Sequence, residues 1–403
     1  MEKLKIKIKT SKCTRKLYFI LKQLYMFFYN LRLVFWGVIF SLFPINSKKI
    51  VVVNYNGKGY GDNPKYIVEY LLDISKENYD IIWLVNDLND SDFPEEIRKV
   101  KNESLKAIYE LTTAKIWIDN TTKRFVPPKR KKQYYIQTWH AGIGMKKVGI
   151  ETQNVDKSYL KSVEKDNKNI DVLISNSTYR TNIYRNSFKY KGEILEVGIP
   201  RNDCLINKTK SVDNIRKKLN LQNKKVVLYA PTYRKDSIME CYNLDLKSVK
   251  DTIEKKYKIE CTILVRLHPY ISGFKFLYDN VNFLDVSKYP DIMDLLLVSD
   301  FVISDYSSLI FDFAITNKPV FLYVPDLVEY SKKEGLNFKI EDLPFESSTS
   351  NEDILLKIEK FDEKRYKEDV KKFFETVGLK ETGQSCKKIV KIINDWSNEN
   401  ETL

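Results

Sequence analysis

Short runs of β-branched and aromatic residues alternate with longer amphipathic stretches along most of the chain after Pro44. Runs of roughly four to eight apolar residues predict buried strands, whereas apolar residues spaced three or four apart predict helices. Strands that alternate with helices are typical of βαβ units stacked around a parallel sheet. The predicted strands are Ile50–Asn54, Ile81–Val85, Lys115–Ile118, Tyr134–Thr138, Asp171–Ser175 and Ile194–Val197 in the first half, and Val226–Ala230, Thr262–Val265, Val281–Leu284, Phe301–Ser304 and Val320–Tyr323 in the second.

The polar, charged stretch Lys208–Lys224 separates these two groups of strands. A chain of 403 residues is long enough for roughly two or three cores. We therefore expect an α/β protein with two doubly wound, Rossmann-type domains, residues 48–210 and 211–403, that face a cleft. An attachment segment of residues 1–47 precedes them, and the last residues, about fifty in number, read as helices. Sheets of this kind bind ligands beyond the carboxyl ends of their strands.

The N-terminal segment combines a basic stretch with an apolar one. Lys and Arg are frequent from Glu2 to Lys22, and Leu24–Ile45 is almost wholly apolar or aromatic. Arg32 interrupts the apolar stretch, where a central Arg costs roughly 2.5–3.5 kcal/mol on insertion into a bilayer. We predict that the segment lies in the interface of an anionic membrane, with the globular body on the cytoplasmic side. A transmembrane helix, a signal peptide and a buried helix pair are the alternatives.

The formal net charge of +14 calls for an anionic partner, and nucleic acid, lipid headgroups and phosphorylated substrates all meet that demand. The basic run Lys129–Lys132 follows two prolines without any nucleic-acid-binding module, so we expect no nucleic acid partner. The five cysteines are scattered without a C-x-x-C pair, which disfavours a disulfide framework and a zinc site and fits a reducing compartment.

The chain has only two histidines, and both lie where a predicted strand ends. His140 follows the strand at Tyr134–Thr138 and precedes a glycine-bearing turn, where an imidazole can take a proton from an alcohol. His268 follows Arg266 by two residues, so both side chains point to one face, and Arg266 offers a planar fork to phosphate oxygens. A purely structural role in the turn is the alternative at each position.

Hydroxyl groups cluster at the turn after the strand Phe301–Ser304. The segment Ser304–Ser308 precedes a helical run, Leu309–Thr316, and free N–H groups at a helix start favour an anion such as a diphosphate. Capping by Asp305 or Ser307 is compatible with this function. Asp312, one turn later, faces either a ribose hydroxyl or solvent. The glycines of Gly57–Pro64 do not have dinucleotide or Walker spacing, so we interpret this stretch as a substrate-side loop.

Five motifs in order give the chain a family resemblance. They are Gln137–Gly142 (QTWHAG), Gly198–Asp203 (GIPRND), Leu228–Arg234 (LYAPTYR), Arg266–Pro269 (RLHP) and Ser304–Ser308 (SDYSS), the last followed by Phe311–Phe313. Together they resemble the CDP-glycerol glycerophosphotransferase family, which includes teichoic acid primases and polymerases. Asp62–Pro64, Lys318, Pro319, Tyr323, Asp326 and Tyr330 also look like family positions. One departure is Ala141-Gly142 after His140, where the family usually has Gly-Thr, which bears on the choice of acceptor.

The resemblance implies a GT-B fold, peripheral attachment to the cytoplasmic face of the cell membrane, a CDP-glycerol or CDP-ribitol donor and a lipid-diphosphate-linked saccharide acceptor. Transfer of the alditol phosphate to a hydroxyl would release CMP during synthesis of teichoic acid or a capsule-type polymer. No tightly bound cofactor or protein metal site is predicted, a Mg²⁺ ion carried by the donor remains open, and homo-oligomers are possible. The predicted site residues are catalytic His140 and His268; donor-binding Arg234, Arg266, Ser304, Asp305, Ser307, Ser308 and Asp312; and acceptor-side or supporting Asn63, Lys146, Arg201 and Asn202.

Two other functions fit parts of the pattern. A GT-B glycosyltransferase would use the same fold and phosphate site but attack a sugar carbon of a nucleotide-sugar donor. A basic scaffold that binds membranes or polyanions would need neither His140 nor Arg266.

Overall fold

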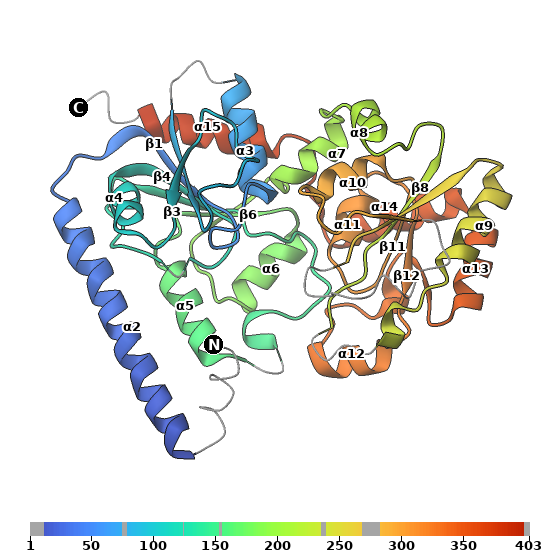
Figure 1. Ribbon diagram of the computed structural model, residues 1–403, viewed down its shortest axis with the longest axis horizontal. Helices are drawn as coiled ribbons and strands as arrows, with labels where there is room; N and C mark the ends of the chain where they lie inside the picture. Colours follow the sequence, from blue (N-terminus) through green and yellow to red (C-terminus); the bar gives the residue numbers. More distant parts are fainter. Residues whose placement is uncertain are drawn as a thin grey trace. The chain divides into compact units, whose positions relative to one another are not determined.

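The protein contains two parallel β-sheets with helices around them, and the computed structural model describes residues 12–74, 79–123, 125–152, 155–234, 239–267 and 283–398 (Figure 1). The first sheet consists of β1 (Asn46–Val53), β2 (Asp80–Val85), β3 (Arg98–Lys101), β4 (Ala114–Asp119), β5 (Tyr134–Gln137), β6 (Val172–Ser175) and β7 (Glu193–Glu196). The second consists of β8 (Lys225–Tyr229), β9 (Cys261–Val265), β10 (Phe283–Asp285), β11 (Phe301–Ser304), β12 (Val320–Tyr323) and β13 (Glu346–Ser348).

Helices follow most of the strands. The α-helices are α2 (Lys12–Phe40), α3 (Asp62–Ile74), α4 (Leu105–Thr113), α5 (Lys157–Asn167), α6 (Thr178–Asn186), α7 (Asp203–Asn207), α8 (Val212–Lys218), α9 (Leu246–Tyr257), α10 (Ile292–Val298), α11 (Leu309–Ala314), α12 (Leu327–Glu334), α13 (Asn351–Lys360), α14 (Glu363–Thr376) and α15 (Ser385–Asn398). Short 3-10 turns are η1 (Gly149–Glu151), η2 (Pro200–Asn202), η3 (Met239–Tyr242) and η5 (Ile340–Asp342). The prediction of helices at the C-terminal end is therefore confirmed.

The two sheets share the same order over six strands, and the first sheet has one further strand, β7, at its edge. The strand order is β3-β2-β1-β4-β5-β6-β7 in the first sheet and β10-β9-β8-β11-β12-β13 in the second. In each sheet the chain starts in the middle, moves to one edge and then returns to build the other half, which is the order of a doubly wound nucleotide-binding sheet. Two doubly wound sheets were expected from the sequence.

The second sheet is buried on both faces because successive residues of its strands enter different cores. Val226 and Leu228 of β8 pack with α10, α11 and α14, whereas Val227 and Tyr229 pack with α9 and α13. The same alternation places Val302 on the first side and Ile303 on the second. Continuous apolar strands are the expected sequence of a parallel sheet covered on both faces.

Two strands escaped the sequence analysis, and both lie at the edge of a sheet. In β3 only Val100 is buried within the sequence Arg-Lys-Val-Lys, and β13 reads Glu-Ser-Ser. Edge strands with charged or polar residues avoid pairing with other chains but lose the hydrophobic pattern that reveals a strand. The strand predicted to begin at Val281 is described from Phe283 onward, and its first two residues lie outside the described part of the chain.

The chain divides into two compact units. The first comprises Met1–Tyr60, Lys76–Ile136 and Ile393–Leu403, and the second comprises Gly61–Ser75 and Gln137–Ile392. In the first unit, α2 packs on α4, where the ring of Phe40 contacts Tyr109. The predicted boundaries at residues 47 and 210 remain predictions.

Candidate functional site

His140 lies three residues beyond the end of β5, on a backbone bend held by side chains. The preceding residue, Trp139, has φ of 53°, a left-handed conformation that is costly for a bulky residue. Its N–H donates to Gln137 Oε1 at 2.9 Å, and its carbonyl accepts from Asn63 Nδ2 at 2.8 Å. Asn63 is wholly buried near the start of α3. These contacts fix the direction in which the chain leaves the strand at His140.

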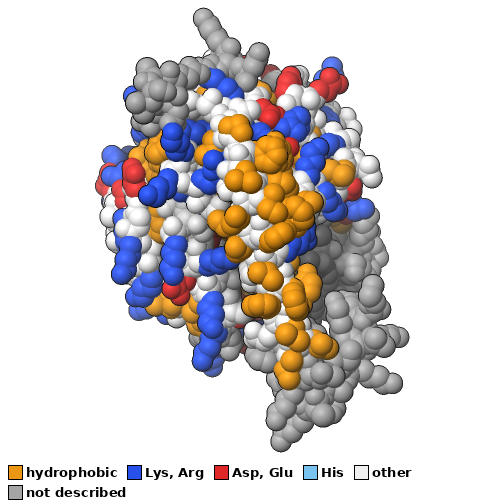
Figure 2. Space-filling view, turned by 90° about the vertical axis from the view of Figure 1, so that its left-hand side faces the viewer, with side chains coloured by type: hydrophobic (Ala, Val, Ile, Leu, Met, Phe, Trp, Pro, Cys, Tyr) orange, Lys and Arg blue, Asp and Glu red, His pale blue; other side chains and the backbone are white. Residues whose placement is uncertain are grey.

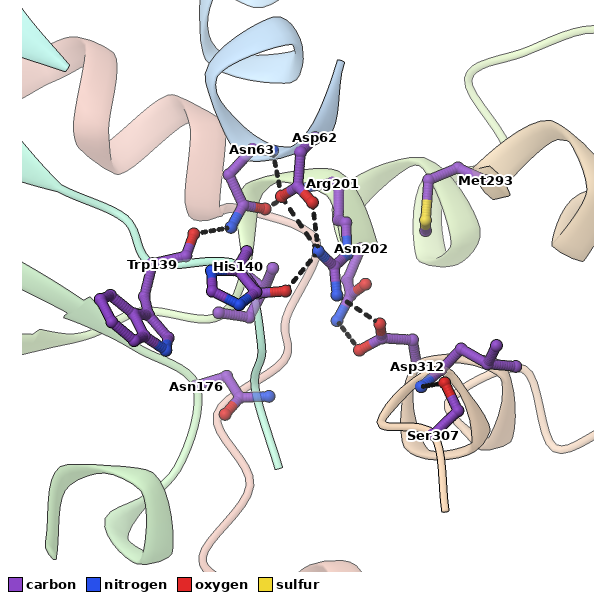
Figure 3. A network of polar contacts seen from close by, with 12 residues as sticks. Asp62, Asn63, Trp139, His140, Asn176, Arg201, Asn202, Met293, Ser307 and Asp312 are labelled. Carbon is purple, nitrogen blue, oxygen red and sulfur yellow. Dashed lines mark hydrogen bonds and ion pairs between the residues drawn. The ribbon is translucent and has the colours of Figure 1, made fainter. Parts of the chain in front are cut away.

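Arg201 joins three different segments of the second unit (Figure 3). Its Nη1 donates to the backbone carbonyl of His140 at 2.7 Å and to both oxygens of Asp62 at 2.9 and 3.0 Å. Its Nη2 donates to Asp312 Oδ2 at 2.7 Å. The side chains of Arg201, Asp62 and Asp312 are each no more than 10% exposed, so these charged hydrogen bonds are largely shielded from water. The GIPRND motif is therefore connected directly to the histidine segment.

A third carboxylate, that of Glu381, joins this network through amide side chains. Asn202 Nδ2 donates to Asp312 Oδ1 at 3.1 Å and to Glu381 Oε1 at 2.9 Å. Glu381 also accepts from Asn176 Nδ2 at 3.1 Å and from the N–H of Ile199 at 3.2 Å. Burial raises the pKa of Glu381 to about 8, against the opposing effect of these donors. Of the two environments considered for Asp312 from the sequence, exposure to solvent is excluded, because the residue is 3% exposed and its carboxylate is bound by Arg201 and Asn202.

Arg234 lies between two carboxylates at the start of the loop after β8. Its Nη1 is 2.8 Å from Asp305 Oδ2, and its Nε is 2.8 Å from Asp326 Oδ2. The guanidinium also lies over the stacked rings of Tyr306 and Tyr330, 5.0 and 4.7 Å from their centroids. Asp305 accepts in addition from Thr232 and from the N–H of Tyr306. Both Arg234 and Asp305 thus hold the turn after β11 in place, and donor binding by either remains a prediction.

Lys146 lies close to the same cluster. Its Nζ is 5.4 Å from the centroid of the Tyr330 ring, and burial lowers its pKa. The backbone carbonyls of Gly144 and Lys146 both accept from Asn337 Nδ2, which joins the segment after His140 to the residues after α12. Lys146 was predicted on the acceptor side, yet the ring that it contacts, that of Tyr330, is also contacted by Arg234, which was predicted to bind the donor.

The remaining predicted donor-binding residues fall into a buried set and an accessible set. Ser304 is buried and donates to the carbonyl of Ala230, whereas Ser307 and Ser308 are half-buried at the turn before α11. Arg266 is also half-buried and donates to the carbonyl of Tyr289 at 2.7 Å. Among these four, the hydroxyls of Ser307 and Ser308 and the guanidinium of Arg266 have the exposure that a ligand requires. His268 lies outside the described residues.

Asp62, Glu381 and Asp326 are part of these networks but were not among the predicted site residues. Asp62 adopts φ of 53°, and it is the first residue of α3, directly before Asn63. Asp62 and Asp326 did stand out as family positions, and this was the available signal. Glu381 had none, because it lies in a polar segment, Lys380–Gln384, between two helices.

No group of three or more His, Cys, Asp or Glu residues suited to hold a metal ion occurs in the described parts of the chain. Cys204, Cys241, Cys261 and Cys386 are buried free thiols. The expectation of no protein metal site stays a prediction.

Both sheets have the doubly wound strand order, and polar residues follow the carboxyl ends of β5, β8 and β11. These features define a GT-B-like fold. Solved structures share it. The wall teichoic acid polymerase TagF aligns with 96% of this chain and 98% of its own at 30% identity and a TM-score of 0.79. A TagF variant soaked with CDPG covers 89% of this chain and 91% of its own at 31% identity and a TM-score of 0.77.

Residues 37–395 match the family described as CDP-Glycerol:Poly(glycerophosphate) glycerophosphotransferase, and the chain belongs to this family of transferases. A teichoic acid poly(glycerol phosphate) polymerase from Bacillus spizizenii is 33% identical over 377 residues, 87% of this chain and 93% of the relative. Another, from Staphylococcus epidermidis, is 33% identical over 371 residues, 87% of this chain. The chain spans about half the length of that relative, 51%, so the larger protein contains regions without a counterpart here.

Proposed function

We propose that the protein transfers glycerol phosphate from CDP-glycerol to a hydroxyl of a lipid-diphosphate-linked saccharide or growing polymer and releases CMP. The observation that carries this proposal is the family match over residues 37–395. Glycerol is favoured over ribitol because the poly(glycerol phosphate) polymerase of Bacillus spizizenii is 33% identical, whereas the poly(ribitol-phosphate) polymerase of the same species is 27% identical. The product belongs to teichoic acid synthesis, with a capsule-type polymer as the alternative.

In the proposed reaction, His140 accepts the proton of the attacking acceptor hydroxyl. The hydroxyl oxygen forms a bond to the glycerol-bearing phosphorus, and the bond from that phosphorus to the CMP oxygen breaks. Phosphoryl transfer needs positioning and fixed positive partners more than covalent help. The backbone at His140 is held by Arg201 and, through Trp139, by Asn63, which supports a positioned base.

Arg266, His268, Ser307 and Ser308 are the proposed partners of the donor phosphates. Within the described residues, the guanidinium of Arg266 donates to one backbone carbonyl, that of Tyr289, and its further N–H groups are the ones proposed to bind phosphate oxygens. Ser307 and Ser308 are half-buried rather than enclosed, so their hydroxyls can reach an anion. Arg234 is already paired with Asp305 and Asp326, which fits a structural role better than a phosphate contact.

The decisive experiment measures CMP release by the purified protein from CDP-glycerol, with a lipid-linked disaccharide as acceptor. CDP-ribitol and UDP-sugars serve as matched alternative donors. Turnover with CDP-glycerol, and its loss by at least about 100-fold in His140→Gln, is expected for a general base. Turnover with a UDP-sugar alone would favour a GT-B glycosyltransferase instead, and no turnover with any donor would contradict the enzyme function.

We also infer that α2 attaches the protein peripherally to the cytoplasmic face of the cell membrane. Its window Gln23–Phe40 is long and apolar enough to cross a bilayer by length and composition. One side of the helix, however, is occupied by the protein: Leu33 is buried, and Arg32 donates to the carbonyl of Glu103. A helix with one face docked on its own domain is suited to lie in the interface rather than to be surrounded by lipid.

The opposite side of α2 is the proposed lipid-binding face. Figure 2 shows its hydrophobic side chains as a continuous stripe with Lys and Arg side chains beside it. The exposed residues of this stripe are Leu24, Tyr25, Phe27, Phe28, Leu31, Val34, Phe35 and Val38. Aromatic and aliphatic side chains flanked by basic ones suit an anionic headgroup layer.

Sedimentation with phosphatidylglycerol-containing vesicles tests this attachment. The double variant Phe27→Asp/Phe35→Asp is expected to remain in the supernatant. Leu88→Asp, at a matched exposed apolar position outside α2, is expected to sediment with the vesicles. Equal binding of all three proteins would contradict a lipid-binding role of α2.

A further inference from the structure

Arg201 connects the backbone of the proposed base, His140, to two carboxylates. Nη1 binds the backbone carbonyl of His140 at 2.7 Å, and the guanidinium spans Asp62 and Asp312 at 2.9 and 2.7 Å. These three acceptors come from the loop after β5, the start of α3 and the middle of α11. In Figure 3 the guanidinium lies at the centre of the network, with His140 on one side and Asp312 on the other.

The charges of this cluster argue against a direct contact with phosphate. Two carboxylates surround one guanidinium whose side chain is 8% exposed, so its positive charge is balanced within the protein. A buried cation that is already paired offers little to an incoming anion, because phosphate would have to displace a carboxylate. Arg201 is therefore placed to organise the protein rather than to bind the donor.

The backbone next to the Arg201 cluster has an unusual conformation that these contacts hold in place. Trp139 and Asp62 both adopt left-handed conformations, with φ of 53° at each, although neither is glycine. Such conformations are costly for residues other than glycine and persist only where the surroundings enforce them. Asn63 binds the carbonyl of Trp139, and Arg201 binds the next carbonyl, that of His140. Successive carbonyls are thus held by the α3 and η2 segments.

We propose that Arg201, fixed by Asp62 and Asp312, is the positioning residue that holds His140 in the geometry for proton transfer. This inference rests on the proposed function for its catalytic consequence, but the position of the imidazole can be measured without turnover. A misplacement of about 1 Å at a reacting group can cost on the order of 100-fold in rate. Lys at position 201 keeps the charge but lacks the fork needed to bind several acceptors at once.

Two histidines in the whole chain make the first test simple. Histidine labelled with ¹³C at Cε1 gives one imidazole signal per residue, and His140→Gln identifies the signal of His140 by its loss. Arg201→Ala and Arg201→Lys are expected to shift or broaden the His140 signal and to leave the His268 signal in place. The control is Arg216→Ala, which removes another partly buried arginine that binds the carbonyl of Val298.

Turnover with CDP-glycerol gives the second readout. Arg201→Ala is expected to lower kcat about 100-fold while the dissociation constant of CDP-glycerol changes less than about threefold. Added guanidinium at millimolar concentration should restore part of kcat in Arg201→Ala, but not in His140→Gln. Arg216→Ala is expected to lose thermal stability without loss of kcat.

An unchanged His140 signal in both Arg201 variants overturns the proposal. So does a loss of donor affinity as the main effect, which would make Arg201 a donor ligand, or a loss of thermal stability with full kcat, which would make it structural only. If the wild-type protein does not use CDP-glycerol, the proposed function fails, while the shift of the His140 signal still decides whether Arg201 positions that residue.

Discussion

The rings of Tyr306 and Tyr330 stack with centroids 3.8 Å apart and planes 9° apart. Tyr306 belongs to the turn after β11, and Tyr330 belongs to α12. Arg234 covers both rings and binds Asp305 and Asp326 at its edges. This aromatic and ionic cluster holds the turn that bears Ser307 and Ser308, so its integrity decides the shape of the proposed phosphate site.

Asp326→Asn should destabilise the protein by about 3 kcal/mol, because it removes one charged partner of a largely buried arginine. Burial raises the pKa of Asp326, but Arg234 outweighs burial and holds that pKa below its ordinary value of 3.8. The contribution is therefore present above pH 3.8 and is lost as pH falls further. Urea unfolding near neutral pH measures the loss. Asp353→Asn, at a half-exposed pair with Lys357, should cost about 0.5 kcal/mol, and an equal loss in both variants would contradict the prediction.

Gly142→Ala should disturb the segment that follows His140. A Cβ at Gly142 would lie 2.2 Å from Asn176 Nδ2, which donates to Glu381, so that Asn176 must move. Overpacking of this kind costs roughly 1–3 kcal/mol. Gly144→Ala is the matched control, since its nearest neighbour, Arg180 Nη1, would be 3.6 Å away. Thermal unfolding of the two variants should show a fall in melting temperature for Gly142→Ala only.

The sequence predicted the central strands well because each carries an uninterrupted apolar run. Val226–Tyr229 and Phe301–Ile303 alternate between two cores, and burial on both faces makes such strands easy to recognise. The edge strand Arg98–Lys101 was missed because one buried valine leaves no pattern. Local signals therefore found the interior of each sheet but not its limits.

The site was predictable in its residue types but not in its pairing. The turns at His140 and Ser307 follow recognisable strands, so their positions could be inferred. The partners of Arg201 could not be inferred, because Asp62 and Asp312 are 139 and 111 residues away in the chain. Glu381 shows the same limit, because its partners Asn202 and Asn176 are 179 and 205 residues away in the chain.

Glu381→Gln should change how stability depends on pH. Burial raises the pKa of Glu381 to about 8, well above its ordinary value of 4.5. Between these values the folded protein keeps a proton that the unfolded chain has released, so the wild-type protein loses stability as pH rises from 4.5 to 8. Gln cannot ionise, and its carbonyl oxygen can still accept from Asn202 and Asn176.

The advantage of Glu381→Gln over the wild type should therefore grow from pH 5 to pH 8. Melting temperatures measured across this range test the expectation. Glu352→Gln, at the start of α13 and away from this network, is the control for the loss of a carboxylate elsewhere. Parallel curves for the wild type and Glu381→Gln would contradict a raised pKa.

Lys146→Met should weaken binding of the donor rather than of the acceptor, if the position of Lys146 beside Tyr330 reflects its function. We expect the KM for CDP-glycerol to rise about tenfold, equivalent to about 1.4 kcal/mol, with a smaller change for the acceptor. The exposed neighbour Lys147 is the matched control, and Lys147→Met should leave both values unchanged.

The charge of Lys146 gives this prediction a pH dependence. Because burial lowers the pKa of Lys146, its ammonium group loses the proton at a lower pH than an ordinary lysine does. The KM for CDP-glycerol should therefore rise on the alkaline side in the wild type, and the rise should disappear in Lys146→Arg, since arginine stays charged. Steady-state kinetics from pH 7 to pH 10 measure both curves. A change confined to the acceptor KM would instead place Lys146 on the acceptor side, as first expected. Its contact with Tyr330 would then have no role in donor binding.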